Sequence, residues 1–269
     1  MSPPSPSAER NRALYGRVAE SYIGWELSPP EQVFLRLLRG RWHEIRMLDI
    51  GVGTGRTSYT FSAIAREYVG IDYAPEMIEL SRQQIGETDA VRFLVCDARD
   101  MAIFDDGAFD VVLFSFNGID SVDERDRGLI LHEVKRLLAP EGLFYFSSHS
   151  LSALPFAYGI PPLTLRDPVR SAYRLLKAVR QNALRLRLNR TLELEPLRER
   201  GRGLVRDEAH GGQLLQFYAT PGYQMRELEQ TGFRVKGVYD LEGRPVESIE
   251  HARDHWLHYL CERGPEPGD

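Results

Sequence analysis

The pattern of hydrophobic positions changes repeatedly between Met47 and Ser150. Short apolar runs, typical of buried strands, are MLDI, YVGID, VRFLVCDA, FDVVLFSF and GLFYFSSHS. The intervening segments TSYTFSAIARE, PEMIELSRQQI and RDRGLILHEVKRLLAP space their apolar residues as helices do. This alternation predicts an α/β fold, a Rossmann-like, doubly wound and mostly parallel sheet with helices on both faces.

The alternation stops after Ser150, where prolines at 155, 161, 162 and 168 precede an arginine-rich helical stretch. It resumes with the helical TPGYQMRELEQTG and the strand-like FRVKGVYDLEG, and DHWLHYLCER fits either a strand or a helix. We therefore predict a disordered tail over 1–12, a core with an N-terminal cover helix over 13–150, a helical lid inserted over 151–212, and the rest of the core over 213–269.

Composition narrows the function classes. The chain has 269 residues, a net charge of −5 and two cysteines, Cys96 and Cys261, which stand far apart. We expect a cytoplasmic protein without a structural zinc site, because there is neither a CxxC motif nor a secretory signal. The lack of a long apolar run predicts no membrane span, and the negative net charge gives no general attraction to nucleic acid.

The turn after the first predicted strand, in MLDIGVGTGR, carries Gly51, Gly53 and Gly55 at alternate positions. Glycines at this place allow either a tight turn or the close approach of a ligand to the backbone. A Walker loop is excluded because GK[ST] is absent. Arg56 stands where the dinucleotide fingerprint has its third glycine, which disfavours a nicotinamide-dependent oxidoreductase.

Polar residues also end the next strands. Asp72, about twenty residues beyond the glycines, fits an acceptor for ribose hydroxyls, although a helix cap is the alternative. Asp97 fits an acceptor for an exocyclic amine or an exposed loop acid, and the fourth strand ends in SFNGID. Carboxyl ends of parallel strands meet at one edge of a sheet, so these positions predict one ligand site.

Together these motifs resemble the class I S-adenosylmethionine-dependent methyltransferases, most closely their small-molecule, type 11-like group. The resemblance covers about Tyr15 to Ser150 and resumes from Tyr218 to Gly243. It implies a seven-stranded sheet, S-adenosyl-L-methionine as cofactor, S-adenosyl-L-homocysteine as product, and no metal. The cofactor-binding residues that it implies are Tyr15, Tyr22, Asp49, Gly51, Gly53, Gly55, Asp72, Tyr73, Met77, Asp97, Ala98, Ser115 and Asn117.

Within that set, the glycines and Asp49 would serve the methionine part, Asp72 the ribose, and Tyr73 and Met77 the adenine faces. Asp97 and Ala98 would contact the base edge. Tyr15 and Tyr22 would cover the cofactor, although their helical spacing also fits simple core packing.

The acceptor predicted from the sequence is a small molecule methylated on oxygen or nitrogen. The motif [DN]PP[YF] and a Pro-Cys nucleophile are both absent, which disfavours nucleobase chemistry. A protein or RNA methyltransferase and a non-catalytic cofactor-binding subunit remain alternatives. The oligomeric state is left open.

Candidate catalytic residues are His149 at the end of the fifth strand and His210 after the insertion, with Asp120 third. Each histidine could instead be structural. Asn117 and Asp120 are also candidates for substrate binding.

The insertion is strongly basic. From Arg166 to Arg206 there are twelve basic and four acidic residues, in a chain whose net charge is −5. On a helix from about Pro168, the apolar face would hold Val169, Ala172, Leu176, Val179 and Ala183, opposite Arg170, Arg174, Lys177 and Arg185. We predict a lid that favours an anionic acceptor through Arg170 and Arg174, with a solvated polar face as the alternative.

Overall fold

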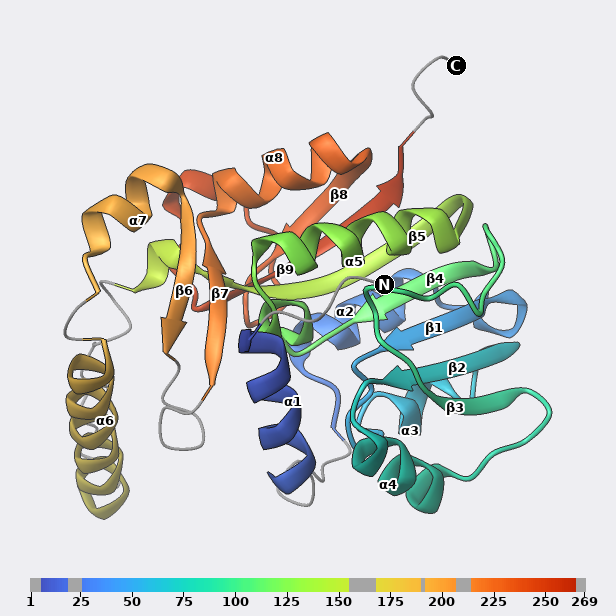
Figure 1. Ribbon diagram of the computed structural model, residues 1–269, viewed down its shortest axis with the longest axis horizontal. Helices are drawn as coiled ribbons and strands as arrows, with labels where there is room; N and C mark the ends of the chain where they lie inside the picture. Colours follow the sequence, from blue (N-terminus) through green and yellow to red (C-terminus); the bar gives the residue numbers. More distant parts are fainter. Residues whose placement is uncertain (1–5, 19–25, 155–167, 190–191, 207–213, 265–269) are drawn as a thin grey trace.

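A computed structural model describes residues 6–18, 26–154, 168–189, 192–206 and 214–264. Its centre is a sheet in the order β3-β2-β1-β4-β5-β7-β6, with β9 pairing with β5 and β8 pairing with β9 (Figure 1). Strands β1 to β5 are parallel to their neighbours in this order, which confirms the predicted doubly wound fold.

The strands are β1 (Arg46–Ile50), β2 (Glu67–Asp72), β3 (Val91–Val95), β4 (Phe109–Phe114), β5 (Leu138–Ser150), β6 (Arg202–Arg206), β7 (Leu215–Ala219), β8 (Phe233–Tyr239) and β9 (Trp256–Arg263). The α-helices are α1 (Pro6–Val18), α2 (Pro29–Leu37), α3 (Ser58–Phe61), α4 (Pro75–Ile85), α5 (Glu124–Leu137), α6 (Pro168–Leu188), α7 (Leu194–Arg200) and α8 (Pro221–Thr231). Short 3-10 turns are η2 (Trp42–Glu44), η3 (Gly118–Ser121), η4 (Leu151–Ala153) and η6 (Ile249–His251).

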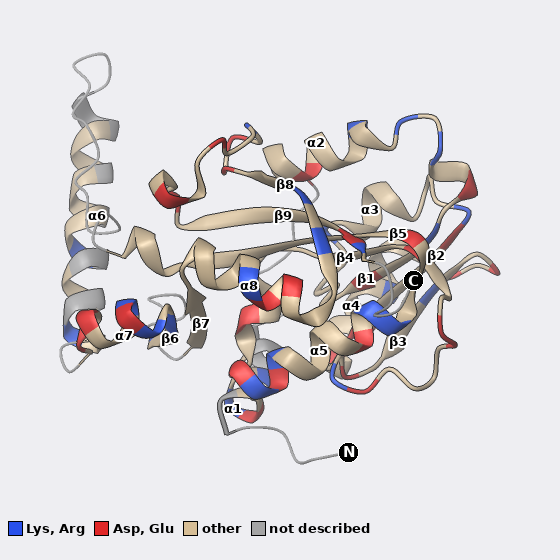
Figure 2. Cartoon of the chain, turned by 90° about the horizontal axis from the view of Figure 1, so that it is seen from above, with Lys and Arg blue, Asp and Glu red and all other residues tan. Residues whose placement is uncertain are grey.

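Strand β4 lies in the middle of the sheet, between β1 and β5, and its apolar sequence reflects burial on both faces. Val112 packs in one core cluster with residues of α5 and α8, whereas Val111 and Leu113 pack in a second cluster with residues of α2, α3 and α4. Figure 2 shows α2 and α3 on one side of the sheet and α5 and α8 on the other.

The carboxyl end of β5 has a neighbour on each edge. His149 is in register with Tyr218 of β7 and with Trp256 of β9. Strand β4 pairs with β5 as far as Phe146 of β5. Beyond that residue, β7 pairs with the same edge of β5. The described part of the sheet thus has nine strands rather than the seven expected, because β6 and β7 extend it beyond the end of β5.

Over residues 6–12 the structure differs from the predicted disordered tail, whereas residues 1–5 lie outside the described residues. Helix α1 already begins at Pro6, and Asn11 is fully buried. The Asn11 side-chain amide donates hydrogen bonds to the carbonyl oxygens of Ser121 and Leu215, both at 2.9 Å. These contacts to distant segments order a stretch whose own composition favours disorder.

Three other segments either differ from what their sequence patterns suggest or resolve an ambiguity in them. Residues 256–263 form the strand β9, and the helix after the glycine turn is only the four residues of α3. Helix α6 lies at the end of the molecule, beyond β6 and β7, in both overall views (Figures 1 and 2). Leu176 and Val179 on its apolar face are 60% and 50% exposed, whereas the pattern predicted packing.

Candidate active site

A cavity of about 510 Å³ opens at the carboxyl ends of the parallel strands. This is the edge at which doubly wound sheets bind their ligands, and the volume is typical of a small-molecule site. Its lining comes from the glycine turn, from the ends of β2, β3, β4 and β5, and from β7 and β9. The lining residues are Asp49, Ile50, Gly51, Val52, Gly53, Thr54, Arg56, Thr57, Asp72, Tyr73, Met77, Cys96, Ala98, Phe114, Ser115, Phe116, Asn117, Gly118, Ser121, His149, Leu214, Gln216 and Trp256.

The glycine turn exposes bare backbone to this cavity. Gly51 and Gly53 have φ angles of +63° and +59°, in the region that favours glycine. A Cβ atom at Gly51 would lie 2.8 Å from the ring of Phe114, whereas one at Gly53 would meet no atom closer than 4.0 Å. Gly53 therefore leaves open space on the cavity side, where a ligand can approach the main chain.

Asp72 ends β2 at the wall of the cavity and is buried. Its carboxylate accepts hydrogen bonds from the backbone N–H groups of Gly53 at 3.1 Å and Ala74 at 2.9 Å. Burial raises the pKa of Asp72 to about 6, although these N–H groups act in the opposite direction. The carboxylate thus braces the glycine turn while facing the cavity.

Asp49 is held below the same turn by two hydroxyl donors. Thr57 Oγ1 lies 2.5 Å and the Tyr68 hydroxyl oxygen 2.6 Å from its Oδ2 atom. Burial raises the pKa of Asp49 to about 6 despite these donors. Asp49 lines the cavity.

Arg56 is fixed by an ion pair with Glu31, a fully buried residue of α2. The two guanidinium Nη atoms lie 2.7 and 2.6 Å from the two carboxylate oxygens of Glu31, which also accepts a hydrogen bond from Ser115. Burial would raise the pKa of Glu31, but the hydrogen bonds and charge of Arg56 outweigh it and lower the pKa. The pair connects α2, the glycine turn and the end of β4.

Asp97, predicted to contact the base edge, is paired with Arg99. Its carboxylate forms two hydrogen bonds with Arg99, from Nε at 3.0 Å and Nη2 at 2.6 Å, and it is not part of the cavity lining. Burial would raise the pKa of Asp97, but the Arg99 side chain holds it below its usual value. The adjacent residues Cys96 and Ala98 line the cavity instead.

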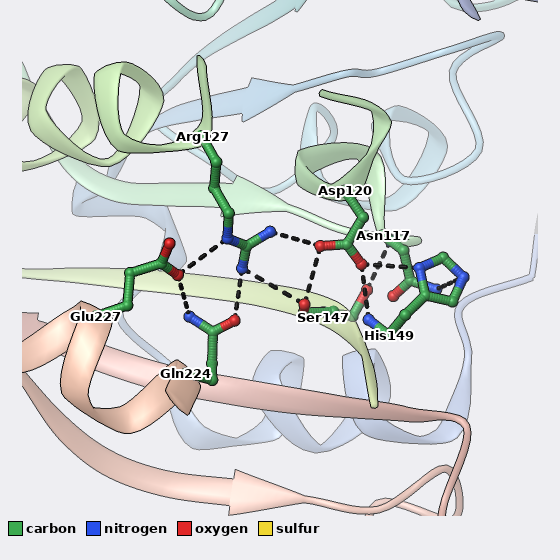
Figure 3. A network of polar contacts seen from close by, with 8 residues as sticks. Asn117, Asp120, Arg127, Ser147, His149, Gln224 and Glu227 are labelled. Carbon is green, nitrogen blue, oxygen red and sulfur yellow. Dashed lines mark hydrogen bonds and ion pairs between the residues drawn. The ribbon is translucent and has the colours of Figure 1, made fainter. Parts of the chain in front are cut away.

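His149 and Asp120 form a buried pair (Figure 3). His149 Nδ1 lies 2.8 Å from Asp120 Oδ2, and the same oxygen accepts a hydrogen bond from the backbone N–H of His149 at 2.6 Å. An Nδ1 proton donated to Asp120 leaves Nε2 as the free base of the ring. His149 lines the cavity, whereas Asp120 lies behind it and is not part of the lining.

Arg127 of α5 supports Asp120 from the side away from His149 (Figure 3). It is fully buried, its Nη1 lies 2.5 Å from Asp120 Oδ1, and its Nε lies 2.9 Å from Glu227. Gln224 accepts a further hydrogen bond from Arg127 at 2.5 Å. A permanent positive charge thus neutralises the Asp120 carboxylate inside the core.

Asn117 connects this network to the cavity. Its Nδ2 lies 3.4 Å from His149 Nε2, and its Oδ1 is buried with no hydrogen-bond partner among the described residues. Phe116 and Asn117 have φ angles of +55° and +58°, which costs non-glycine residues about 1–3 kcal/mol each. Such strain is typical of functional sites, and here it turns both residues toward the cavity.

The cavity thus brings together most of the residues predicted to bind the cofactor. Those that line it are Asp49, Gly51, Gly53, Asp72, Tyr73, Met77, Ala98, Ser115 and Asn117. Gly55, Asp97 and Asp120 lie outside the lining. Tyr22 and His210 lie outside the described residues, as do the side chains of Tyr15, Arg170 and Arg174.

Sequence reasoning missed several lining residues, among them Phe116, Leu214, Gln216 and Trp256. Phe116 lies inside the quoted SFNGID motif and its aromatic character was a usable signal. Trp256 gave no such signal, because only strand pairing brings β9 beside His149.

Among the described residues, no three His, Cys, Asp or Glu side chains group as metal ligands would. No described helix has the length and apolar character needed to cross a membrane.

Comparison with known sequences matches residues 47–142 to a family model described as a methyltransferase domain. A demethylmenaquinone methyltransferase of Clavibacter sepedonicus is 36% identical over 110 residues, which are 41% of this chain and 43% of that protein. A ubiquinone/menaquinone biosynthesis C-methyltransferase of Citrifermentans bemidjiense is 30% identical over 172 residues, 56% of this chain and 68% of the relative. The match to the first of these relatives thus spans less than half of its length.

Solved structures share the fold. An S-adenosylmethionine-dependent methyltransferase from Mesorhizobium loti superposes with a TM-score of 0.58 at 17% identity, covering 87% of this chain and 98% of that one. A Burkholderia thailandensis 1,6-didemethyltoxoflavin-N1-methyltransferase, with 1,6-didemethyltoxoflavin and S-adenosylhomocysteine bound, gives a TM-score of 0.56 at 16% identity. The match covers 98% of this chain and 92% of that one.

Proposed function

Because this chain belongs to the class I S-adenosylmethionine-dependent methyltransferases, we propose that it methylates a hydroxyl oxygen of a small-molecule acceptor. The observation that carries the proposal is the His149–Asp120 pair, 2.8 Å apart at the wall of the cavity. A base in this place is needed for an acceptor that must lose a proton, and hydroxyl groups are such acceptors.

The residues around the glycine turn fit the cofactor. Gly53 leaves open space for a ligand, and the Asp72 carboxylate would accept hydrogen bonds from ribose hydroxyls. Tyr73 and Met77 would pack against adenine, and the backbone amide of Ala98 would contact the base edge. We leave Asp97 out of this assignment because it is not part of the described cavity lining.

The cofactor supplies an electrophilic methyl group on a sulfonium, so the protein mainly positions and deprotonates the acceptor. His149 Nε2 would take the hydroxyl proton while Asp120 keeps the ring in the required tautomer. The oxygen electron pair then forms the new O–CH3 bond, and the electron pair of the broken C–S bond stays on sulfur. Asp120 would stabilise the protonated imidazole, and Arg127 would hold the Asp120 carboxylate in place.

A second candidate is methylation of a ring carbon next to the hydroxyl. It is favoured by the Citrifermentans bemidjiense relative, which is named a C-methyltransferase and of which 68% is matched. The same proton transfer to His149 would start this reaction, because loss of the hydroxyl proton makes a neighbouring ring carbon more nucleophilic. That carbon would form the new C–CH3 bond while the electron pair of the broken C–S bond stays on sulfur. The methylated carbon would then release its own proton, which restores the ring and the hydroxyl group. The position of the new methyl group separates the two candidates.

We also propose that the insertion favours an anionic acceptor. Helix α6 carries six basic residues and no acidic one. Arg56 is the one Lys or Arg of the described cavity lining, and it is paired with Glu31. An acceptor carboxylate or phosphate would therefore depend on the arginines of α6, among them Arg170 and Arg174.

The test is methyl transfer from methyl-labelled S-adenosylmethionine to hydroxylated metabolites of the native pool, with RNA as a parallel acceptor. We expect label in a small-molecule product, and ¹³C NMR of the methyl group distinguishes O–CH3 from C–CH3. His149→Asn should lower turnover by about 10²-fold or more and leave cofactor affinity unchanged. Full turnover in His149→Asn contradicts the base assignment, and label only in RNA contradicts the acceptor class.

A further inference from the structure

Four aromatic rings form one side of the cavity region. Phe116, His149, Tyr218 and Trp256, which we call the aromatic wall, come from the turn after β4 and from β5, β7 and β9. His149 and Tyr218 stack with ring centres 4.6 Å apart and an angle of 26°. Trp256 meets His149 edge-on at 6.0 Å and Phe116 edge-on at 4.9 Å.

Strand register sets most of this arrangement. Tyr218 and Trp256 are the direct cross-strand partners of His149, one on each edge of β5. Direct partners point to the same face of a sheet, so the three rings stand side by side on the face that borders the cavity. Tyr218 is buried behind His149, whereas His149 and Trp256 both line the cavity.

Phe116 completes the wall from the opposite direction. It is 51% exposed, which is unusual for phenylalanine, and its backbone is in the left-handed region. The Arg56 guanidinium lies 4.8 Å from its ring centre, and the ion pair with buried Glu31 fixes that guanidinium. The ring is therefore supported from one side and held at the cavity rather than packed into the core.

We propose that the acceptor is aromatic, and that Phe116 and Trp256 select it by packing against its planar ring. This inference rests on the proposed function, because it takes the cavity to hold the methyl acceptor beside His149. Aromatic rings gain from edge-to-face and offset packing at centre distances of 4.5–7 Å, the spacings already present in the wall. A saturated ring of the same size gains only its hydrophobic burial.

The chemistry of the base leads to the same class of acceptor. A phenolic hydroxyl has a pKa of about 10, far below the pKa of water or of an aliphatic hydroxyl. A histidine base can therefore share or remove a phenolic proton far more easily, because the difference in acidity between acceptor and base is much smaller. A ring packed on Phe116 and Trp256 would present such a hydroxyl close to His149.

Binding without turnover tests this proposal. The protein is saturated with S-adenosylhomocysteine, so that the cofactor part of the cavity is filled, and titrated calorimetrically with 2-naphthol and with its saturated counterpart decahydro-2-naphthol. We expect 2-naphthol to bind roughly three- to tenfold more tightly. Phe116→Leu and Trp256→Leu should each remove most of that preference, whereas Phe116→Tyr and Trp256→Phe should keep it.

Controls separate this inference from the proposed function. Tyr59→Leu removes an aromatic side chain that is 60% exposed and outside the cavity lining, and it should leave both affinities unchanged. His149→Asn should keep the preference for 2-naphthol while losing turnover. Equal affinity for the two probes, or a preference that survives both leucine variants, overturns the aromatic acceptor. If 2-naphthol binds more tightly than its saturated counterpart but no phenol is methylated, the result supports selection by the aromatic wall and contradicts the proposed function.

Discussion

The Nδ1 atom of His149 lies 2.8 Å from Oδ2 of Asp120, and that oxygen also accepts the backbone N–H of His149. One carboxylate oxygen thus fixes both the ring and the strand that carries it. Asp120 is fully buried, so the tautomer of His149 is set from inside the core and not by solvent.

Replacing Asp120 by asparagine should lower kcat by roughly 10²- to 10⁴-fold, because an amide can stabilise the wrong tautomer and cannot stabilise the imidazolium. Cofactor affinity should stay within a few-fold. Ser148→Ala is the matched control, since it removes a hydroxyl donor 2.9 Å from Asp120 without touching His149. Unchanged kcat in a folded Asp120→Asn protein would show that the pair is structural.

Asp72→Ala should weaken S-adenosylmethionine binding by about 1–3 kcal/mol through the loss of charge-assisted hydrogen bonds. Isothermal titration calorimetry measures the change. Glu76→Ala, an exposed acid in the first turn of α4, should leave the affinity unaltered. An Asp72→Ala protein with normal affinity would remove Asp72 from the ribose site.

Cofactor affinity should also depend on pH. Burial raises the pKa of Asp72 to about 6, so its carboxylate is ionised at pH 8 and becomes protonated as the pH falls through 6. A protonated carboxyl is the poorer acceptor for ribose hydroxyls, and the dissociation constant should therefore increase below pH 6. Asp49 titrates in the same range, so Asp72→Asn should remove only part of the dependence. A dependence identical to that of the wild type would assign the effect to Asp49.

Gly53→Val should abolish cofactor binding, because φ is +59° and a branched side chain would enter the open space beside the turn. Gly128→Ala is the matched control within α5, where an added Cβ meets no atom within 4 Å. That variant should bind normally and gain up to about 1 kcal/mol of unfolding free energy, since alanine favours helices. Normal binding by Gly53→Val would place the cofactor elsewhere.

Reversing Arg170 and Arg174 to glutamate should raise KM for the acceptor and leave cofactor binding unchanged. Salt screens the attraction between exposed charges over about 8–10 Å near physiological ionic strength. The wild-type KM for an anionic acceptor should therefore also rise as the salt concentration increases. The double variant Arg39→Glu/Arg92→Glu makes the same charge change at exposed positions outside the cavity lining. An acceptor KM that does not change with salt concentration and has the same value in both double variants would contradict an anionic acceptor.

The sequence by itself determined the parallel sheet and the location of its ligand edge. Apolar runs and helical spacing are local patterns, and the carboxyl ends of parallel strands must meet. Asp49, Gly53 and Asp72 could therefore be assigned to one ligand site from the sequence alone, because each lies within three residues of the end of a strand. His149 was predicted at the same edge of the sheet, because it lies near the carboxyl end of the fifth predicted strand.

Tertiary structure alone decided what these side chains meet. Nothing in the local pattern shows that Asp120 lies behind His149, or that Arg127 meets Glu227 in the core. Trp256 reaches the cavity because β9 pairs with β5 in one register, and a shift by one residue would turn its side chain to the other face. Contacts between residues more than a hundred positions apart are set by packing of the whole chain, which no short stretch of sequence encodes.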